Sequence, residues 1–115
     1  MTDGQSVRRV SEWDPDRLRA LADAHDTPLY VQDLDRVREN CERLTAAFPD
    51  ADVRYAMKAH SGRSVLETVH AAGLDAECAS AGEVDRALAA GFGGDLLPST
   101  AVHPPSRHLA YLSLL

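Results

Sequence analysis

Apolar residues recur at helical spacing in four stretches of the chain. Asp14 and Pro15 predict the start of the first helix, because a carboxylate can cap the backbone and proline fits the first helical position. Thr27-Pro28 ends this helix, since proline cannot continue it. The residues from Asp35 to Phe48 predict a second helix, with apolar positions three or four apart and charged residues between them.

Each of the last two helices is expected to begin at a capping box. In this motif a serine caps the backbone and a glutamate three residues later reaches back to it. A glycine then closes each helix, because glycine readily adopts the left-handed conformation that ends many helices. The serine, glutamate and glycine of the two helices are Ser64, Glu67 and Gly73, then Ser80, Glu83 and Gly91.

Short apolar runs between the helices predict strands at residues 29–31, 53–59, 74–79 and 96–100. From residue 35 onward, helices and strands alternate singly, which predicts right-handed crossovers and a parallel sheet. The repeat spacing fits a (β/α) barrel, and a doubly wound sheet fits equally at this length. Neither G-x-G-x-x-G nor a P-loop follows any of these strands, which argues against a nucleotide-binding fold.

Composition indicates a globular protein that binds neither nucleic acid nor a membrane. The 115 residues are 44% hydrophobic and 26% charged, which argues against a disordered chain. The formal net charge of −6 opposes contact with phosphate backbones. No segment approaches the roughly 20 apolar residues of a membrane span, and the amino terminus lacks the apolar core of a signal peptide. A reducing, cytoplasmic location is therefore predicted.

The cysteines and histidines show no metal-ligand spacing, so no metal site is predicted. Cys41 and Cys78 are isolated within apolar patterns, which predicts buried free thiols. The five histidines are scattered along the chain and form no zinc signature.

Lys58 is the single lysine in a chain that otherwise uses arginine for every basic position. Arginine holds its proton too tightly to act as a nucleophilic amine, whereas a desolvated lysine can form a Schiff base with an aldehyde. A lone lysine against this background indicates amine chemistry, and chance codon usage is the alternative explanation.

The predicted strand 53–59 places Lys58 at its carboxyl end, where α/β folds carry catalytic residues. Alternation along this strand directs Arg54, Ala56 and Lys58 toward a barrel interior. The residues expected to face the helices are Val53, Tyr55 and Met57. Glu77 and Ser80 occupy the matching end of the next strand. A buried Lys–Glu pair or a solvated strand end explains the same placement without chemistry.

Three segments together resemble a known family. They are TPLYVQDLDRVREN (27–40), YAMKAH (55–60) and AECASAGEVDRALAAGF (76–92). In order and spacing they are similar to the N-terminal region of the fold-type III pyridoxal-phosphate decarboxylases, which act on diaminopimelate, ornithine or arginine. Within that family the motifs look most similar to those of the diaminopimelate decarboxylases. The resemblance implies an α/β fold that forms the N-terminal part of an alanine-racemase-like (β/α)8 TIM barrel.

The resemblance also implies a cofactor, pyridoxal 5'-phosphate, and the residues that hold it. Lys58 matches the lysine that binds this cofactor as a Schiff base, and Ala56 matches the alanine that packs near it. Glu77 and Ser80 belong to a segment that matches the family's acid-x-x-Ser-x-x-Glu motif, which Glu83 completes. Two residues depart from the usual pattern, because the family often carries aspartate at the position of Glu77 and asparagine at the position of His60.

The domain organisation follows from the same resemblance. Residues 1–26 are expected to form an N-terminal segment with a short helix, and residues 27–34 a strand that joins the family's β-domain. Residues 35–115 are then part of the cofactor-binding barrel. Since such a barrel needs about 250 residues, the chain is expected to be truncated and inactive by itself. The full-length family enzymes usually form homodimers.

The implied reaction is loss of carbon dioxide from a small amino acid, most directly from meso-diaminopimelate to give L-lysine. Decarboxylation of another basic amino acid or of a carboxylated polyamine fits the same motifs. A non-catalytic barrel protein that carries pyridoxal phosphate is a third possibility, although the LYVQDLD segment argues against it. The fourth is a degenerate product without function.

Overall fold

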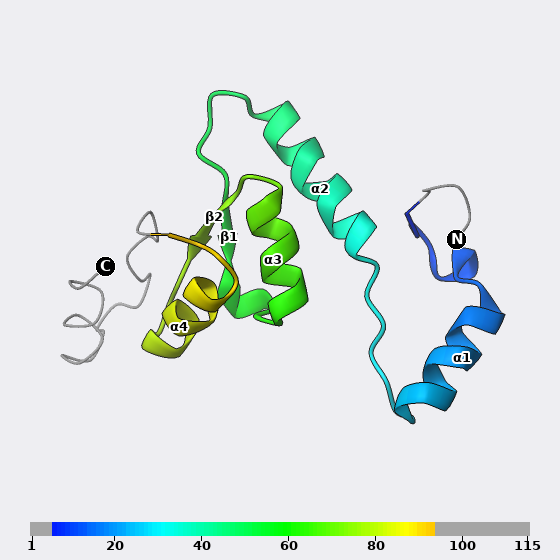
Figure 1. Cartoon of the computed structure of the whole chain (residues 1–115). Helices are drawn as coiled ribbons and strands as arrows, with labels where there is room; N and C mark the ends of the chain where they lie inside the picture. Colours follow the sequence, from blue (N-terminus) through cyan, green and yellow to red (C-terminus); the bar gives the residue numbers. More distant parts are fainter. Residues whose placement is uncertain (1–5, 94–115) are drawn as a thin grey trace.

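The computed structural model describes residues 6–93. Helices and strands alternate from α2 onward, so the described part has the α/β order that the sequence predicts (Figure 1). The elements are the 3-10 turn η1 (Val10–Glu12), α1 (Pro15–His25), α2 (Leu34–Ala47), β1 (Arg54–Ala56), the 3-10 turn η2 (Met57–Ala59), α3 (Arg63–Ala71), β2 (Asp75–Glu77) and α4 (Ala81–Ala89).

The strands β1 and β2 pair in parallel, and α3 makes the crossover between them. This confirms the predicted parallel arrangement for the described strands. The aligned pairs are Arg54 with Asp75, Tyr55 with Ala76, and Ala56 with Glu77. Both strands are shorter than the predicted ranges 53–59 and 74–79, because the backbone leaves the ladder for η2 directly after Ala56. The predicted strand 96–100 lies outside the described residues.

The expectation of a strand at residues 29–31 is wrong within the described structure. Residues 26–33 form neither helix nor strand, and they connect α1 to α2. A strand requires a neighbour that accepts and donates its backbone hydrogen bonds, and no described segment pairs with this one. Tyr30 is fully exposed, at 100% of its surface. The membership of residues 27–34 in a β-domain stays a prediction.

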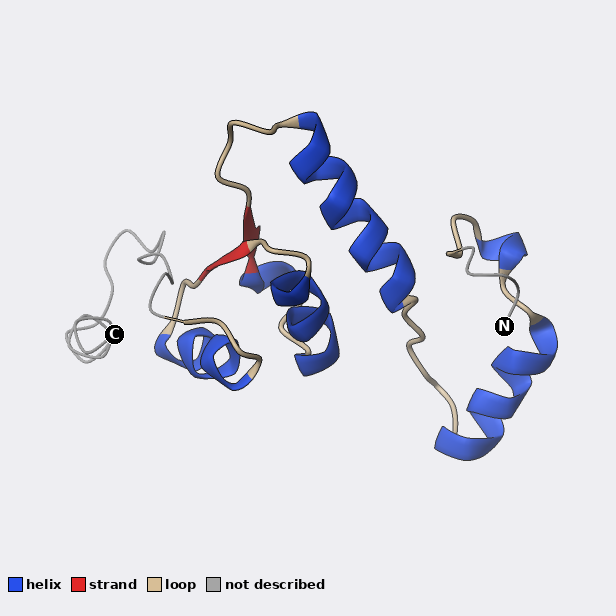
Figure 2. Cartoon of the chain, turned by 45° about the horizontal axis from the view of Figure 1, so that its top comes forward, coloured by secondary structure: helices blue, strands red, loops and turns tan. Residues whose placement is uncertain are grey.

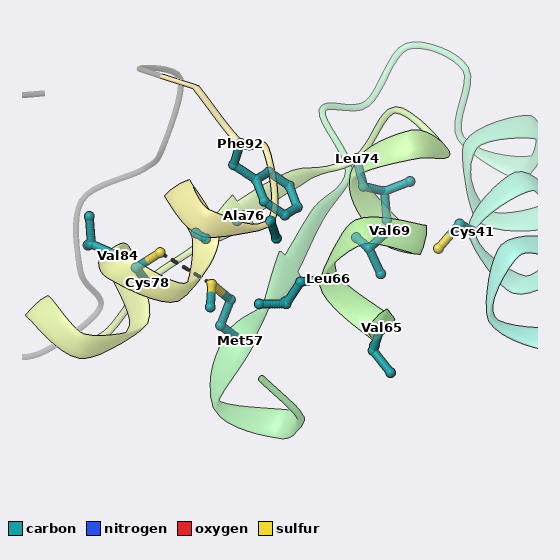
Figure 3. Packing of buried hydrophobic residues seen from close by; sticks show 12 residues of the cluster. Cys41, Met57, Val65, Leu66, Val69, Leu74, Ala76, Cys78, Val84 and Phe92 are labelled. Carbon is teal, nitrogen blue, oxygen red and sulfur yellow. Dashed lines mark hydrogen bonds between the residues drawn. The ribbon is translucent and has the colours of Figure 1, made fainter. Parts of the chain in front are cut away.

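The core lies between the sheet and the helices α3 and α4, with α2 packed on the outer side of α3 (Figure 3). α3 contributes Val65, Leu66 and Val69, and α4 contributes Val84 and Ala87. The other buried apolar residues of the cluster are Cys41, Met57, Leu74, Ala76, Cys78, Ala90 and Phe92. Tyr55 and Val53 pack against this cluster, so the predicted helix-facing side of the first strand is confirmed.

α1 stands apart from this core, as Figure 2 shows. Asp14 caps the helix by accepting a hydrogen bond from the Asp16 N–H at 3.0 Å, and Pro15 is its first residue, as predicted. None of its residues is buried, so its apolar face finds little cover among the described residues. The N-terminal segment instead contacts α2, where the Ser6 hydroxyl donates to the Glu39 carboxylate at 2.5 Å.

Neither predicted capping box forms in full. At α4 the serine half is present, because the Ser80 hydroxyl accepts from the Glu83 N–H at 3.1 Å, but the Glu83 carboxylate accepts from the N–H of Ala79, one residue before the cap, at 3.0 Å. The prediction for α3 is wrong, because this helix begins at Arg63 with Gly62 as its N-cap and Ser64 lies inside the first turn. The helical ladder starts two residues early, since the Leu66 N–H donates to the Gly62 carbonyl at 3.0 Å.

Substituting Ser80→Ala is expected to lower the free energy of unfolding by about 1 kcal/mol, because it removes a helix cap. Ser64→Ala is the matched control and should change stability by less than about 0.5 kcal/mol, since Ser64 caps no helix and alanine favours helical backbone. Urea denaturation of both variants, followed by circular dichroism, measures the difference. Equal losses of stability would contradict the assignment of the caps.

Candidate active site

Lys58 lies in the turn η2, directly after β1, and not on the strand where the sequence places it. The reason is that the backbone coils into a 3-10 turn at Met57, which breaks the alternation of side chains. Met57 is 1% exposed and belongs to the core, whereas Lys58 is exposed. The amine is therefore still at the carboxyl end of β1, as predicted, but on a turn that leaves the sheet.

The other predicted site residues lie at the same edge of the sheet. Ala56 and Glu77 are the last residues of their strands and are aligned with each other. Ser80 follows three residues after Glu77 and caps α4. Ala56 and Glu77 are half-buried, and Ser80 is exposed. The structure thus gathers all four residues at one edge, each within two or three positions of a strand end.

The explanation of Lys58 as a buried partner of Glu77 does not hold. Lys58 is exposed and makes no ion pair with any residue in the range 6–93. The arginines behave differently, since several of them pair with nearby carboxylates, as Arg63 does with Glu67 at 2.7 Å. The lysine amine is therefore open to react with a small molecule.

The two cysteines are buried free thiols, as predicted. Burial raises the pKa of the Cys78 thiol to about 11, and the charges of Glu83 and Glu77 act in the same direction. Burial likewise raises the pKa of Cys41. Both side chains stay protonated near neutral pH, so neither is a nucleophile there. Among residues 6–93, no group of three or more His, Cys, Asp or Glu side chains is arranged to hold a metal ion.

A set of hydrogen bonds around Lys58 was not predicted from the sequence. The Tyr55 hydroxyl donates to the His60 carbonyl at 2.6 Å, and the Gly62 N–H donates to His60 Nδ1 at 3.1 Å. A guanidinium N–H of Arg86 on α4 donates to the Ser61 hydroxyl at 3.0 Å. A signal for a turn was present in the sequence, because the Ser61-Gly62 dipeptide is typical of turns.

Residues 34–113, more than half of the chain, match the family described as pyridoxal-dependent decarboxylase, pyridoxal binding domain. The chain belongs to the pyridoxal-dependent decarboxylase family. The sequence-based resemblance is thereby confirmed, and the matched range includes β1, η2, β2 and the three helices around them. No helix in the described part of this decarboxylase-family chain is long and apolar enough to cross a membrane.

Curated relatives of this family member are named diaminopimelate decarboxylase. The protein of Deinococcus radiodurans is 42% identical over 78 residues, which cover 68% of this chain and 21% of the relative. The protein of Streptomyces coelicolor is 40% identical over 84 residues, or 71% of this chain and 18% of the relative. The chain spans about a fifth of the length of these relatives. No solved structure matches it.

The family's cofactor is pyridoxal phosphate, whose aldehyde can be held covalently by a primary amine. The residues of the described edge fit this group. Lys58 is the chain's only lysine, its side chain is exposed, and it points from a turn at the carboxyl end of a parallel strand. Ala56 adds little bulk beside it, and Glu77 adds a carboxylate on the neighbouring strand.

Proposed function

We propose that this chain supplies the cofactor lysine of a pyridoxal-phosphate-dependent decarboxylase that converts meso-diaminopimelate to L-lysine and carbon dioxide. The observation that carries the proposal is the position of Lys58, a solitary and accessible amine at the carboxyl end of β1 inside the segment that matches the family. When bound, pyridoxal phosphate supplies an electron sink for the electron pair that remains as carbon dioxide leaves.

The chain's own residues hold and orient this group. Lys58 would hold the cofactor through its amine. Ala56 leaves room beside the amine, and Glu77 and Ser80 line the neighbouring strand end. The Ser80 oxygen already accepts the Glu83 N–H, so its hydroxyl proton is the part of the side chain that can donate to the cofactor.

The larger architecture is part of the same proposal. Helices and strands alternate from α2 to α4, and the two strands pair in parallel through the crossover helix α3. This order supports a place for residues 35–115 in a (β/α)8 barrel. Residues 27–34 would contribute a strand to a separate β-domain. We also propose that the complete enzyme is a homodimer and that it lies in the cytoplasm. Its substrate would be a small amino acid.

A decarboxylase for another basic amino acid or for a carboxylated polyamine is the second candidate. The residues at the carboxyl ends of β1 and β2 are compatible with this second candidate, because the bond between Lys58 and the cofactor does not determine which substrate binds. The names of the relatives favour diaminopimelate, because those that match at 40–42% identity share that name. A non-catalytic carrier of pyridoxal phosphate is the third candidate, and it predicts binding without turnover.

A genetic experiment separates these candidates in the organism that encodes the chain. Changing the Lys58 codon to arginine at its own locus is expected to impose a growth requirement for lysine. Changing the codon of Arg43, an exposed residue of α2, to lysine is the matched control and should leave growth unchanged. A requirement relieved by polyamines would favour the second candidate. Unchanged growth of the Lys58→Arg strain would contradict the decarboxylase proposal.

A further inference from the structure

The turn that carries Lys58 is fixed on both sides of the lysine. On one side, the Met57 side chain is buried, and the Cys78 thiol donates to its sulfur at 3.5 Å (Figure 3). On the other side, the Tyr55 hydroxyl donates to the His60 carbonyl at 2.6 Å. This bond spans the whole of η2, so it closes the chain around Lys58. An exposed lysine on an exposed turn would otherwise sample many orientations.

The Tyr55 bond depends on a protonated phenol. Burial raises the pKa of Tyr55, and the nearby Cys41 acts in the same direction. The hydroxyl therefore keeps its proton near neutral pH, where it can donate to the His60 carbonyl. A carbonyl oxygen that accepts such a bond holds the backbone of His60 in place directly after the turn.

The His60 ring makes the second connection. Its Nδ1 accepts the Gly62 N–H at 3.1 Å. The ring lies close against Gly62, because a Cβ at that position would approach the ring carbon Cε1 to 2.6 Å. Glycine is therefore required at position 62 while the ring keeps this position.

Gly62 links the ring to the crossover helix. It is the N-cap of α3, and its carbonyl accepts the Leu66 N–H at 3.0 Å. Ser61, which lies between His60 and Gly62, accepts a hydrogen bond from Arg86 of α4 at 3.0 Å. The segment after Lys58 is thus tied to both helices that cover the sheet, and His60 is the residue through which the turn and α3 are joined.

We propose that His60 is a positioning residue, whose imidazole ring joins the Lys58 turn to the start of α3 and so presents the lysine amine to the cofactor in one orientation. The inference rests on the proposed function for its purpose, but its geometry is independent of the cofactor. Asparagine can replace histidine in this role, since its side-chain oxygen can accept the same N–H two residues on. Alanine cannot.

Two measurements on the full chain test this proposal. The first is hydrogen exchange of the Gly62 amide, followed by NMR without cofactor. The second is the rate at which pyridoxal phosphate becomes attached to Lys58, measured by borohydride reduction and mass spectrometry of the peptide. For His60→Ala we expect faster Gly62 exchange and a capture rate lower by about three- to tenfold, the effect of one hydrogen bond. His60→Asn should restore both.

His25→Ala is the matched control, because His25 is exposed at the end of α1 and should change neither quantity. Tyr55→Phe should slow capture while leaving the Gly62 bond in place. The proposal is overturned if His60→Asn behaves like His60→Ala, or if His60→Ala captures the cofactor at the wild-type rate. A wild-type chain that captures no cofactor at Lys58 would refute the proposed function. Gly62 exchange would then still decide whether His60 holds the turn.

Discussion

Substituting Lys58→Arg is expected to lower the covalent capture of pyridoxal phosphate by about tenfold or more, because the guanidinium does not act as an amine nucleophile. The change keeps the positive charge and a long side chain. Lys58 is exposed and makes no ion pair within residues 6–93, so the fold should tolerate it. Borohydride reduction followed by mass spectrometry of the intact chain gives the fraction captured.

The sharpest control moves the lysine instead of deleting it. In the double variant Lys58→Arg with Arg43→Lys, the chain again has one lysine, but on an exposed position of α2. Capture should remain at the low level of Lys58→Arg, which is set by the terminal amine and unspecific reaction. Recovery of wild-type capture in the double variant would show that any exposed lysine suffices, and the assignment of Lys58 would then fail.

Substituting Leu66→Ala is expected to lower the free energy of unfolding by about 2–5 kcal/mol. Leu66 is 0% exposed and points from α3 toward Met57, the first residue of η2 (Figure 3). Truncation removes apolar contacts and leaves a cavity that the short sheet cannot close. Because small domains are stable by only about 5–15 kcal/mol, the loss is a large part of the total. Urea denaturation followed by circular dichroism measures it.

Leu44→Ala is the matched control for this effect. It deletes the same atoms from α2, but Leu44 is 47% exposed, so the expected loss is below about 1 kcal/mol. The comparison separates burial from the loss of leucine as such. If the two variants were equally stable, Leu66 would not belong to the core that supports the site.

Local signals in the sequence were sufficient for most helix ends. Asp14 and Ser80 cap their helices as predicted, because a cap needs only a side chain and an N–H two or three residues away. Gly73 and Gly91 have φ angles of 88° and 106°, the left-handed backbone expected after a helix. α2 begins one residue earlier than predicted, with Asp33 as its cap.

The predictions that were wrong concern features that depend on contacts the local pattern does not show. The turn at Lys58 forms because Met57 turns inward to reach Cys78, 21 positions away, and no local pattern shows that contact. The predicted N-cap of α3 was Ser64, but the helix begins after Gly62, whose N–H donates to the His60 ring. The edge shared by Lys58 and Glu77 was nevertheless predictable, because parallel strands with one crossover bring their carboxyl ends together.

The crossover by α3 also bears on the order in which the chain folds. Each rung of the β1–β2 ladder joins residues 21 positions apart, as Arg54 and Asp75 are. α3 holds nine of the intervening residues in a helix, which advances about 1.5 Å per residue where an extended chain advances about 3.3 Å. Forming α3 therefore shortens the loop that pairing must close, and this lowers its entropic cost. The strands should therefore pair only once α3 has formed, and the Lys58 turn between β1 and α3 becomes ordered when they pair.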